Sequence, residues 1–511
     1  MALSSAIILD AVSRAVGYKL SLAQFAATSE LLPISIAVLG EYNTANQATV
    51  TENVPFPFTS ADEVGAEFGY GSPLHIQARI LRPVSGNILG GIPTTIYPQK
   101  SDAGATATVI KIGVAVATTV TENATHELVV NGRRSIDGNR YAFSVVKGQN
   151  QAAVTASIID AVNNVLQAPI TASLSTLDVD CTTKWKGITS AELNISIETN
   201  GKAAGIVYSE VSKTAGAGVI SLATSLGNFG ETWHNLVVNP YADQLETLED
   251  FNGIPDPDTP TGRWNSISFN PFVAVFGSVL SDKDDVVAIT NAAARRDQVT
   301  NAIAMAPNSK GFTFEAAANM VASYAIIAQN NPHVDNSGKS YNDMPVPSDG
   351  IIGDFSDWAN RDFMAKRGSG TVNITNGKYT VQDFFTTYVP DGVTNPKFRF
   401  VKDLVIDFNM EFAWRIIMIR DIQDKAIIAD GSVTNVPKTI SPKQVLQLIN
   451  SHVELAEVRG LIVDAAFSKA SAKVEINATN PARLDIFFRY KRSSTAHILS
   501  SDVEVDFNYT T

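Results

Sequence analysis

Cysteine is almost absent from this chain, with Cys181 the single one among 511 residues. One cysteine excludes an intramolecular disulfide and a cysteine-based metal site. The chain therefore suits a reducing compartment, or an assembly held together without covalent cross-links. An apolar run of about 20 residues, as a membrane span needs, is also missing. Asp10 interrupts the first apolar stretch and no basic residue precedes it, so we expect no secretory signal and synthesis in the cytosol.

Charged residues are scarce as well. They make up 18% of the chain, against roughly 25% in ordinary soluble domains. The net charge is −12, and the densest basic stretch, Arg489–Arg492, is short and isolated. Binding to nucleic acid or to anionic membranes is therefore not expected. A low charge fraction fits a protein that buries much of its surface against partners, and this length predicts three or more domains.

Motifs for catalysis and cofactor binding are missing. The chain has no Gly-x-Ser-x-Gly nucleophile elbow and no phosphate-binding loop. The pairs Gly69-Tyr70-Gly71 and Gly216-Ala217-Gly218 lack the third glycine of a dinucleotide fingerprint, so we interpret them as turn or close-packing positions. The sequence predicts neither an enzyme nor a cofactor. Six histidines stand outside any recognisable motif, and we expect structural roles for His75, His126, His234, His333, His452 and His497.

Two acidic clusters could in principle bind a metal ion. Asp256 and Asp258 alternate with prolines, and Asp282, Asp284 and Asp285 lie close together further along the chain. Neither cluster supplies the ladder of oxygen ligands that calcium sites use. Solvated loops are the better interpretation, and we predict no metal site.

Short apolar runs alternate with helical patterns after residue 210, and similar sequence occurs before residue 100. Alternating strands and helices predict βαβ units and a mainly parallel sheet. Ser60 is a capping residue for a helix that ends near Phe68, whereas the Asn-, Pro- and Gly-rich stretch at 330–370 is predicted to be loop. The expected strands are Ile34–Leu39, His234–Val238, Phe272–Val279 and Ala302–Ala306, and a helix is expected with Phe314, Ala318, Val321 and Ala325 on one face.

A β-rich module is predicted at 101–209, inserted into this α/β region. Residues 104–130 are rich in Thr, Val and Ala, and strand-like sequence continues to about residue 208. Asn131-Gly132 and Asp137-Gly138 are turn signals. The module also contains a predicted helix, with Val154, Ile158, Val162 and Leu166 four residues apart on one face.

Residues 371–482 predict an α+β domain. Thr371–Phe385 has the pattern of a hairpin that turns at Asn376-Gly377. A capping Ser441, a proline at the next position and Gln444 three residues after the cap predict a helix to about Val458. Further strands are predicted at Ala472–Ile476, Leu484–Arg489 and Val503–Tyr509, and Leu404–Ile419 is strongly apolar.

The last of these strands alternates polar and apolar residues without a break from Asp502 to Tyr509. This is the period-2 signature of a half-buried strand, and a terminal strand needs a partner edge to be ordered. An edge in its own domain would make it a closing strand, which the pattern alone slightly favours. An edge in another copy would make it a donated arm. The apolar positions are Val503, Val505, Phe507 and Tyr509.

Four segments, in order across nearly the whole chain, resemble segments of the contractile-tail sheath proteins of Mu-like bacteriophages. The segment SADEVGAEFGYGSPL (60–74) resembles an acidic stretch followed by Phe-Gly-x-Gly-Ser-x-Leu in those proteins. The segment NPYAD (239–243) resembles the Pro-Tyr-Thr-Asp that follows one of their core strands. FTTY resembles the Thr-Thr-Tyr that opens their C-terminal domain, and NPARLD the Asn-Pro-x-Arg-hydrophobic-Asp before the final strands. An Arg is common three residues before the Thr pair, where this chain has Asp383. The matching positions are Phe68, Gly69, Gly71, Ser72, Pro240, Tyr241, Thr386, Thr387, Tyr388, Pro481, Arg483 and Asp485.

The resemblance implies a structural virion protein without enzymatic activity. Such subunits polymerise as stacked hexameric rings around a tail tube and contract to drive the tube through the host envelope for genome delivery. The implied fold has a subtilisin-like α/β core (26–100 and 210–370) without a protease triad, and an insert that faces outward. Arms at 1–25 and 483–511 would complete a sheet shared between neighbours, which makes the terminal segment a donated strand.

The implied partners are other copies of the chain, the tail tube protein, and baseplate and tail terminator proteins, assembled in the host cytoplasm. Nucleic-acid contact and membrane insertion are not implied. The helix at 441–458 is a candidate for the face that touches the tube, or else an ordinary packed helix. Two other functions stay open: another tail component, such as a tube or baseplate protein, and a degenerate α/β hydrolase.

Overall fold

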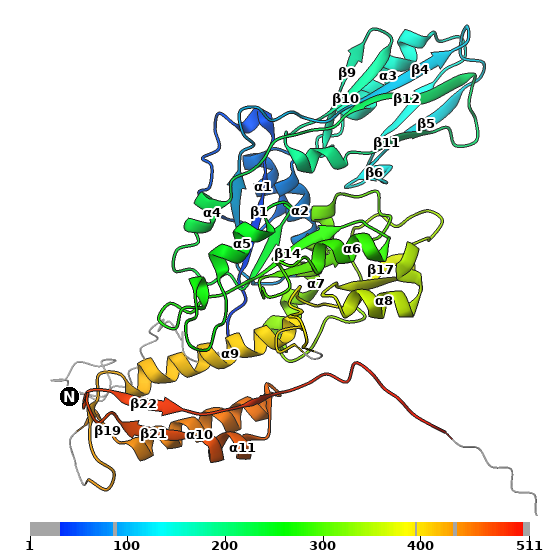
Figure 1. Ribbon diagram of the computed structural model, residues 1–511. Helices are drawn as coiled ribbons and strands as arrows, with labels where there is room; N and C mark the ends of the chain where they lie inside the picture. Colours follow the sequence, from blue (N-terminus) through cyan, green and yellow to red (C-terminus); the bar gives the residue numbers. More distant parts are fainter. Residues whose placement is uncertain (1–30, 85–88, 394–395, 433–436, 504–511) are drawn as a thin grey trace, which may run out of the picture. The chain divides into compact units, whose positions relative to one another are not determined.

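Figure 1 shows a computed structural model of the chain, which describes residues 31–84, 89–393, 396–432 and 437–503. Two compact units make up the chain. The larger contains Ile34–Asp407 and the segment from Arg492 onward, and the smaller contains Phe408–Lys491 with the residues up to Pro33. The boundary at Asp407 falls within helix α9 (Val401–Ile417). In the described ranges, no helix has both the length and the hydropathy needed to cross a membrane.

A six-stranded sheet forms the centre of the larger unit. Its order is β15-β14-β13-β1-β3-β2, in which the first five strands are parallel and β2 is an antiparallel edge. Counted along the chain, the parallel strands follow the order 2-1-3-4-5 of a doubly wound sheet. Burial on both faces explains their unbroken apolar sequences and confirms the four predicted strands. The bounds are β1 (Ile36–Glu41), β2 (Phe56–Pro57), β3 (Thr94–Gln99), β13 (Leu236–Asn239), β14 (Val273–Ser278) and β15 (Asn301–Met305).

Helices cover both faces of this sheet. α2 and α7 pack on one face, and α4 and α5 contribute to a core on the other. A Cβ at Gly277 of β14 would lie 1.8 Å from the carbonyl oxygen of Thr313, so glycine is what lets α7 begin this close to the strand. The predicted buried face of α7 and the Ser60 cap of α1 are both confirmed. The bounds are α1 (Ala61–Phe68), α2 (Pro73–Leu81), α4 (Ala223–Gly227), α5 (Leu245–Asn252), α6 (Lys283–Thr290), α7 (Thr313–Asn330) and α8 (Trp358–Ala365).

The interpretation of 330–370 as loop needs a correction. Residues 331–352 lack helix and strand, but a short 3₁₀ turn and α8 follow within the stretch. Asp357 caps α8 by accepting a hydrogen bond from the amide of Ala359 at 3.1 Å. This cap was missed because it lies among other polar loop residues. The described residues also contain the 3₁₀ helices η1 (Thr44–Asn46), η2 (Ile188–Glu192), η3 (Gly262–Trp264) and η4 (Gly353–Ser356), and the π-helix η5 (Met418–Ile422).

The β-rich region of the larger unit has a four-stranded sheet, β12-β4-β10-β9, and a three-stranded sheet, β11-β5-β8, around one core with α3 (Gln151–Asn163). Val154, Ile158 and Val162 are buried there, but Leu166 lies beyond the end of α3 and is 58% exposed, so the predicted helix face was one residue too long. Cys181 is buried in β10, and burial raises the pKa of its thiol to about 12. The strands are β4 (Val109–Val116), β5 (Ala124–Val130), β6 (Ser135–Ile136), β7 (Asn139–Arg140), β8 (Ala142–Val145), β9 (Ile170–Ser175), β10 (Asp178–Thr183), β11 (Ile195–Glu198) and β12 (Ile206–Thr214).

The predicted hairpin is present in the larger unit as β16 (Thr371–Thr375) and β17 (Lys378–Asp383). Asn376 and Gly377 both have positive φ, as a tight hairpin turn requires.

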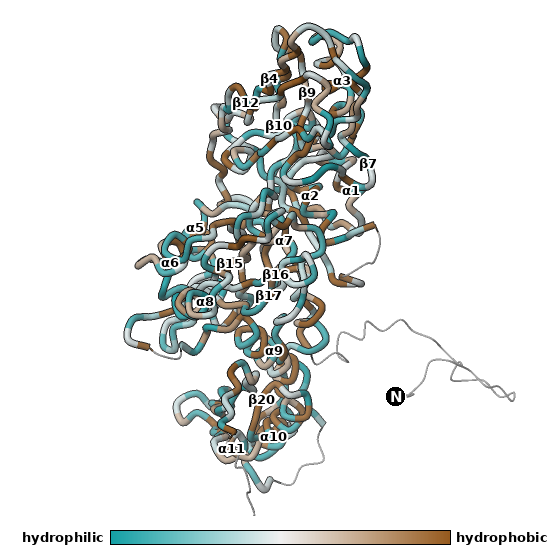
Figure 2. The backbone as a smooth tube through the Cα atoms, turned by 90° about the vertical axis from the view of Figure 1, so that its right-hand side faces the viewer, coloured by the Kyte–Doolittle hydropathy of each residue, from teal (hydrophilic) through white to brown (hydrophobic). Residues whose placement is uncertain are grey.

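The smaller unit is built on α10 (Pro442–Val458), which begins with the predicted capping box of Ser441 and Gln444. One face of α10 is buried, and in Figure 2 the helix shows both brown and teal residues, as an amphipathic helix should. An antiparallel hairpin of β21 (Lys473–Ile476) and β22 (Leu484–Phe487) packs beside it. The remaining elements are β18 (Ala426–Ile427), β19 (Thr439–Ile440), β20 (Ile462–Val463) and α11 (Ala465–Ser471), and β23 (Lys491–Arg492) spans the boundary between the units.

Candidate functional site

The carboxyl edge of the central sheet is the first place to look for chemistry. In open α/β sheets, ligands bind where the strand order reverses, outside the carboxyl ends of the strands. Here that point lies between β1 and β13. The residues that follow these strands include Asn43 and Tyr241, and β1 itself ends at Glu41.

Several polar groups at this edge bind one another, although Oε2 of Glu41 is buried without a hydrogen-bond partner among the described residues. Glu41 is 1% exposed and accepts a hydrogen bond from the hydroxyl of Thr189 at 3.0 Å. The hydroxyl of Tyr241 donates to Gln99 at 3.1 Å, and the indole of Trp185 donates to Thr189 at 3.0 Å. Burial raises the pKa of Glu41 to about 8, although the hydrogen bond from Thr189 and the nearby hydroxyl of Tyr241 oppose the shift. The carboxyl is therefore neutral at pH 7 and enclosed, which does not suit a general base.

This raised pKa predicts a pH-dependent stability. The folded state holds the proton of Glu41 more tightly than the unfolded state, so this contribution is complete below pH 4.5 and is lost as the pH rises to about 8. We expect the free energy of unfolding to fall across this window by at most roughly 1.4 kcal/mol per pH unit. Glu41→Gln cannot ionise and should flatten the dependence in denaturant unfolding at pH 5, 7 and 9. The exposed Glu67→Gln is the control, and equal slopes for Glu41→Gln and the parent chain would contradict the assignment.

Two of the buried histidines, His234 and His126, are hydrogen-bonded at both ring nitrogens. His234 has its Nε2 2.8 Å from the hydroxyl of Tyr97 and its Nδ1 3.0 Å from that of Ser35. His126 contacts the hydroxyl of Tyr208 and the carbonyl of Lys202, each at 2.7 Å. Burial lowers the pKa of His234 to about 4. A neutral ring that is hydrogen-bonded at both nitrogens has a structural role.

Gly69, Gly71 and Ser72, which belong to the first segment that resembles sheath proteins, form the link between α1 and α2. Gly69 and Gly71 have φ values of 92° and 80°, in the left-handed region. A Cβ at Gly69 would lie 2.2 Å from the Asn43 side chain, and one at Gly71 would lie 2.1 Å from the carbonyl oxygen of Ala168. Ser72 caps α2. These residues hold a tight turn against both the edge of the central sheet and the β-rich region.

Phe68, Pro240 and Tyr241 are buried in the α/β core. Phe68 meets Phe56 edge-on with ring centroids 5.2 Å apart. Tyr241 carries the hydroxyl that binds Gln99 at the carboxyl edge. Both aromatic residues thus support that edge from the core.

The Thr-Thr-Tyr positions extend the central sheet at its β15 edge. Thr386 forms an antiparallel bridge with Ala302, and the amide of Thr387 donates to the carbonyl of Asn301 at 2.9 Å. Both threonines are fully buried. Tyr388 packs on Phe398 at the next position.

Pro481, Arg483 and Asp485 lie in the β21–β22 hairpin of the smaller unit. The amide of Asn477 donates to the carbonyl of Arg483 at 2.9 Å, and Asp485 accepts from the Asn477 side chain at 2.7 Å. Arg483 also donates to Asp485 at 2.5 Å. Phe68, Gly69 and Tyr241 thus meet at the carboxyl edge of the sheet, whereas the threonine pair lies at the β15 edge and Pro481, Arg483 and Asp485 lie in the smaller unit.

Of the predicted donated strand, Val503 is described and is 78% exposed, while Val505, Phe507 and Tyr509 lie outside the described residues. The preceding segment is anchored on the larger unit. Arg492 donates to Asp407 at 2.8 Å, and the ring of His497 stacks on Phe400 at 4.9 Å.

Two carboxylates face the His497 ring. Asp335 and Asp383 lie 3.4 and 3.9 Å from its nitrogens, and the contact with Asp335 raises the pKa of His497. The residue that departs from the family pattern, Asp383, is thus one that contacts the C-terminal segment.

The acidic clusters bind backbone amides. Asp256 accepts from the amides of Asp258 and Thr259, at 2.8 and 2.7 Å. Asp282 caps α6 by accepting from the amide of Asp284 at 2.8 Å. Within the ranges the structure describes, no group of three His, Cys, Asp or Glu side chains is placed to hold a metal ion.

A buried ion pair joins the β-rich region to α7. Arg133 donates to the two carboxylate oxygens of Glu315 at 3.0 and 2.8 Å, and also to the carbonyl of Asp343 at 2.7 Å. Glu315 is 1% exposed. Burial lowers the pKa of Arg133, but the charges of Glu315 and Asp343 outweigh it and raise the pKa overall. The guanidinium therefore stays charged and fixes the joint.

Sequence reasoning missed the Glu41 cluster and the Arg133–Glu315 pair. Their partners are 148 and 182 positions apart in sequence, and no local pattern marks them. Glu41 ends an apolar strand, and its position at a carboxyl edge was the one signal that could have drawn attention to it.

Comparison with known proteins gave matches among solved structures. No family model matches the chain, and no curated protein matches it. The sheath tail protein of Desulfitobacterium hafniense is 10% identical with a TM-score of 0.45, over 94% of this chain and 100% of that one. The sheath tail protein of Listeria innocua is 10% identical with a TM-score of 0.41, over 90% and 95%. The sheath of an extracellular contractile injection system (PVC), in its contracted state, is 9% identical with a TM-score of 0.43, over 97% and 98%.

Proposed function

We propose that this chain is the structural subunit of a contractile tail sheath and has no enzymatic activity. The observation that carries the proposal is an incomplete sheet combined with a spare strand sequence. Among the described residues, β21 and β22 pair only with each other, and a two-stranded sheet is marginally stable by itself. The alternating segment Asp502–Tyr509 supplies a further strand. Donation of that strand by a neighbouring copy would complete the sheet.

The proposal assigns a role to each part of the chain. Residues 26–100 and 210–370 form a subtilisin-like core without a triad, which the parallel sheet with helices on both faces supports. The insert at 101–209 faces outward, and 371–482 form the C-terminal domain. The arms at 1–25 and 483–511 exchange strands between hexameric rings, as in the Mu-like proteins that the chain resembles. α10 faces the tail tube, and the ends of the polymer meet baseplate and terminator proteins in a virion assembled in the host cytoplasm.

Strand exchange and contraction are physically compatible. The main-chain hydrogen bonds of a donated strand do not depend on how the domain bodies pack, so the bodies can rotate while the lattice stays connected. A contracted state with more buried apolar surface between bodies would drive the change without nucleotide hydrolysis. The neutral, buried Glu41 is consistent with a core that has a mechanical role and binds no substrate.

Negative-stain electron microscopy of the purified full-length chain tests the proposal. Hollow striated tubes with sixfold end views are expected, because the contracted polymer should form without the inner tube. Monomers that persist at high concentration would instead favour a tube or baseplate component. Labelling by a serine-reactive probe would favour a degenerate hydrolase.

A further inference from the structure

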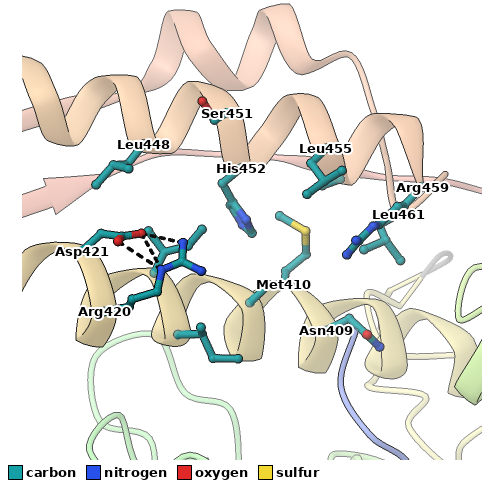
Figure 3. A pocket seen from close by; sticks show the side chains of 14 residues that line it. Asn409, Met410, Arg420, Asp421, Leu448, Ser451, His452, Leu455, Arg459 and Leu461 are labelled. Carbon is teal, nitrogen blue, oxygen red and sulfur yellow. Dashed lines mark hydrogen bonds and ion pairs between the residues drawn. The ribbon is translucent and has the colours of Figure 1, made fainter. Parts of the chain in front are cut away.

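An apolar groove lies between α9 and α10 in the smaller unit (Figure 3). It encloses about 140 Å³. Apolar surface of this kind gains free energy when it is covered. Its walls include Met410, Ala413 and Ile416 of α9, Leu448 and Leu455 of α10, and Leu461 just after α10.

The lining also includes polar groups, namely Asn409, Ser451, Arg459 and the ion pair of Arg420 with Asp421. Among the polar groups, His452 shows what kind of occupant fits. His452 is 5% exposed, and in Figure 3 its ring points from α10 toward α9. Within the described residues, its buried Nε2 has no hydrogen-bond partner. Burial lowers the pKa of this ring to about 4, so it is neutral at pH 7 and can pair with a peptide N–H or C=O. The groove therefore suits an apolar stretch of polypeptide better than a lipid chain, which has no group to satisfy Nε2.

The start of the described chain lies at one end of this groove. The amide of Leu32 donates to Asn409 Oδ1 at 2.8 Å, and Asn409 lines the groove. Figure 3 shows the blue ribbon of this segment beside Asn409. The groove wall from Asn409 to Ile417 is about 12 Å long, which about four extended residues can span. Thirty residues precede Leu31, so the chain is long enough to fill the groove several times over.

The sequence just before Leu31 matches the chemistry of the groove. Residues 20–29 (LSLAQFAATS) contain no charged side chain, so they can enter apolar surroundings without desolvating a charge. We infer that residues 20–30 of the same chain lie in the α9–α10 groove, with Leu20, Leu22 and Phe25 against its walls and a backbone group on Nε2 of His452. This inference concerns the folded single chain and does not rest on the proposed function. It would leave residues 1–19 of the N-terminal arm for strand exchange between neighbours.

Hydrogen–deuterium exchange of the full chain, at a concentration where chromatography shows monomer, tests the inference. The variant Leu22→Asp/Phe25→Asp would place charges in the apolar groove. We expect exchange in peptides covering 408–420 and 445–460 to rise about tenfold or more, because the segment no longer covers them. The matched control is Leu3→Asp/Ile8→Asp, which makes the same kind of change outside the stretch and should leave these peptides unchanged.

A second variant addresses the groove itself. Ala413→Phe fills the cavity and should speed exchange in the peptide that covers 20–30, while the peptides of the central sheet stay protected. Unchanged exchange in both variants would overturn the inference. Protection of the groove that appears only as concentration rises would also overturn it, because the segment would then come from a second copy. Neither of these exchange results changes whether the full chain forms tubes. Electron microscopy of tubes therefore tests the proposed function separately from this inference.

Discussion

Removal of Asp502–Thr511 is expected to leave both units folded and to abolish polymerisation. Of the deleted segment, the structure describes Asp502 and Val503, and both are exposed. In the proposed sheath, however, it carries the main-chain hydrogen bonds that link one copy to the next. Circular dichroism should be unchanged, while sedimentation and electron microscopy should detect no tubes at concentrations where the full chain assembles.

Substitutions within the segment separate strand donation from a nonspecific effect of shortening. Val505→Asp/Phe507→Asp places charges on the apolar face of the alternating pattern and should block assembly as the deletion does. Glu504→Gln/Asp506→Asn alters the opposite face, keeps the pattern, and should preserve tubes. Tubes formed by the truncated chain would refute strand donation and turn the segment back into an ordinary closing strand.

Local features of this fold follow from the sequence because the interactions that create them are local. Ser441 and Gln444 satisfy helix N-terminal amides three residues apart, and Asn376-Gly377 adopts the positive φ values that a hairpin turn needs. The parallel strands were recognisable because burial on both faces demands unbroken apolar runs. For the cap and the turn, the chain a few residues away supplies the partner, whereas the strands were recognised from their own apolar sequences although their partners lie far along the chain.

Contacts between residues that are far apart in the sequence cannot be predicted from local patterns. Nothing near Glu41 indicates that Thr189 will donate to it, and nothing near Arg133 indicates Glu315. Leu166 fits the spacing of a helix face, yet the helix ends three residues earlier and the side chain stays exposed. Hydrophobic periodicity predicts which residues lie on one face of a helix, but it does not predict the residue at which the helix ends.

The resemblance to sheath proteins indicated some of these contacts indirectly. Gly69 and Gly71 stand where a side chain would collide with Asn43 and with the backbone of Ala168. Thr386 and Thr387 pair with the edge of β15. The segments that carry the resemblance thus include places where different parts of the chain meet closely, and their roles in this structure are in packing.

Removing one partner of the Arg133–Glu315 pair should cause a large loss of stability. Glu315→Ala leaves a guanidinium with 14% of its side chain exposed and without its bidentate partner. Breaking a buried pair from one side costs about 3–5 kcal/mol. Calorimetry should show the transition of the larger unit shifted to lower temperature. Limited proteolysis should cut between the β-rich region and α7 sooner than in the parent chain.

Two comparisons show whether the cost comes from the unpaired charge. Arg133→Met/Glu315→Leu removes both charges and keeps apolar volume, so it should cost less than Glu315→Ala alone. Lys366→Ala breaks the exposed pair with Asp362 and should cost less than about 1 kcal/mol. A loss below about 1 kcal/mol for Glu315→Ala would mean that solvent reaches Arg133 in the variant and that the pair does not fix the joint. If the double variant is stable but its tubes are irregular, the pair serves to orient the β-rich region on the core, since the remaining difference from the parent chain is geometric.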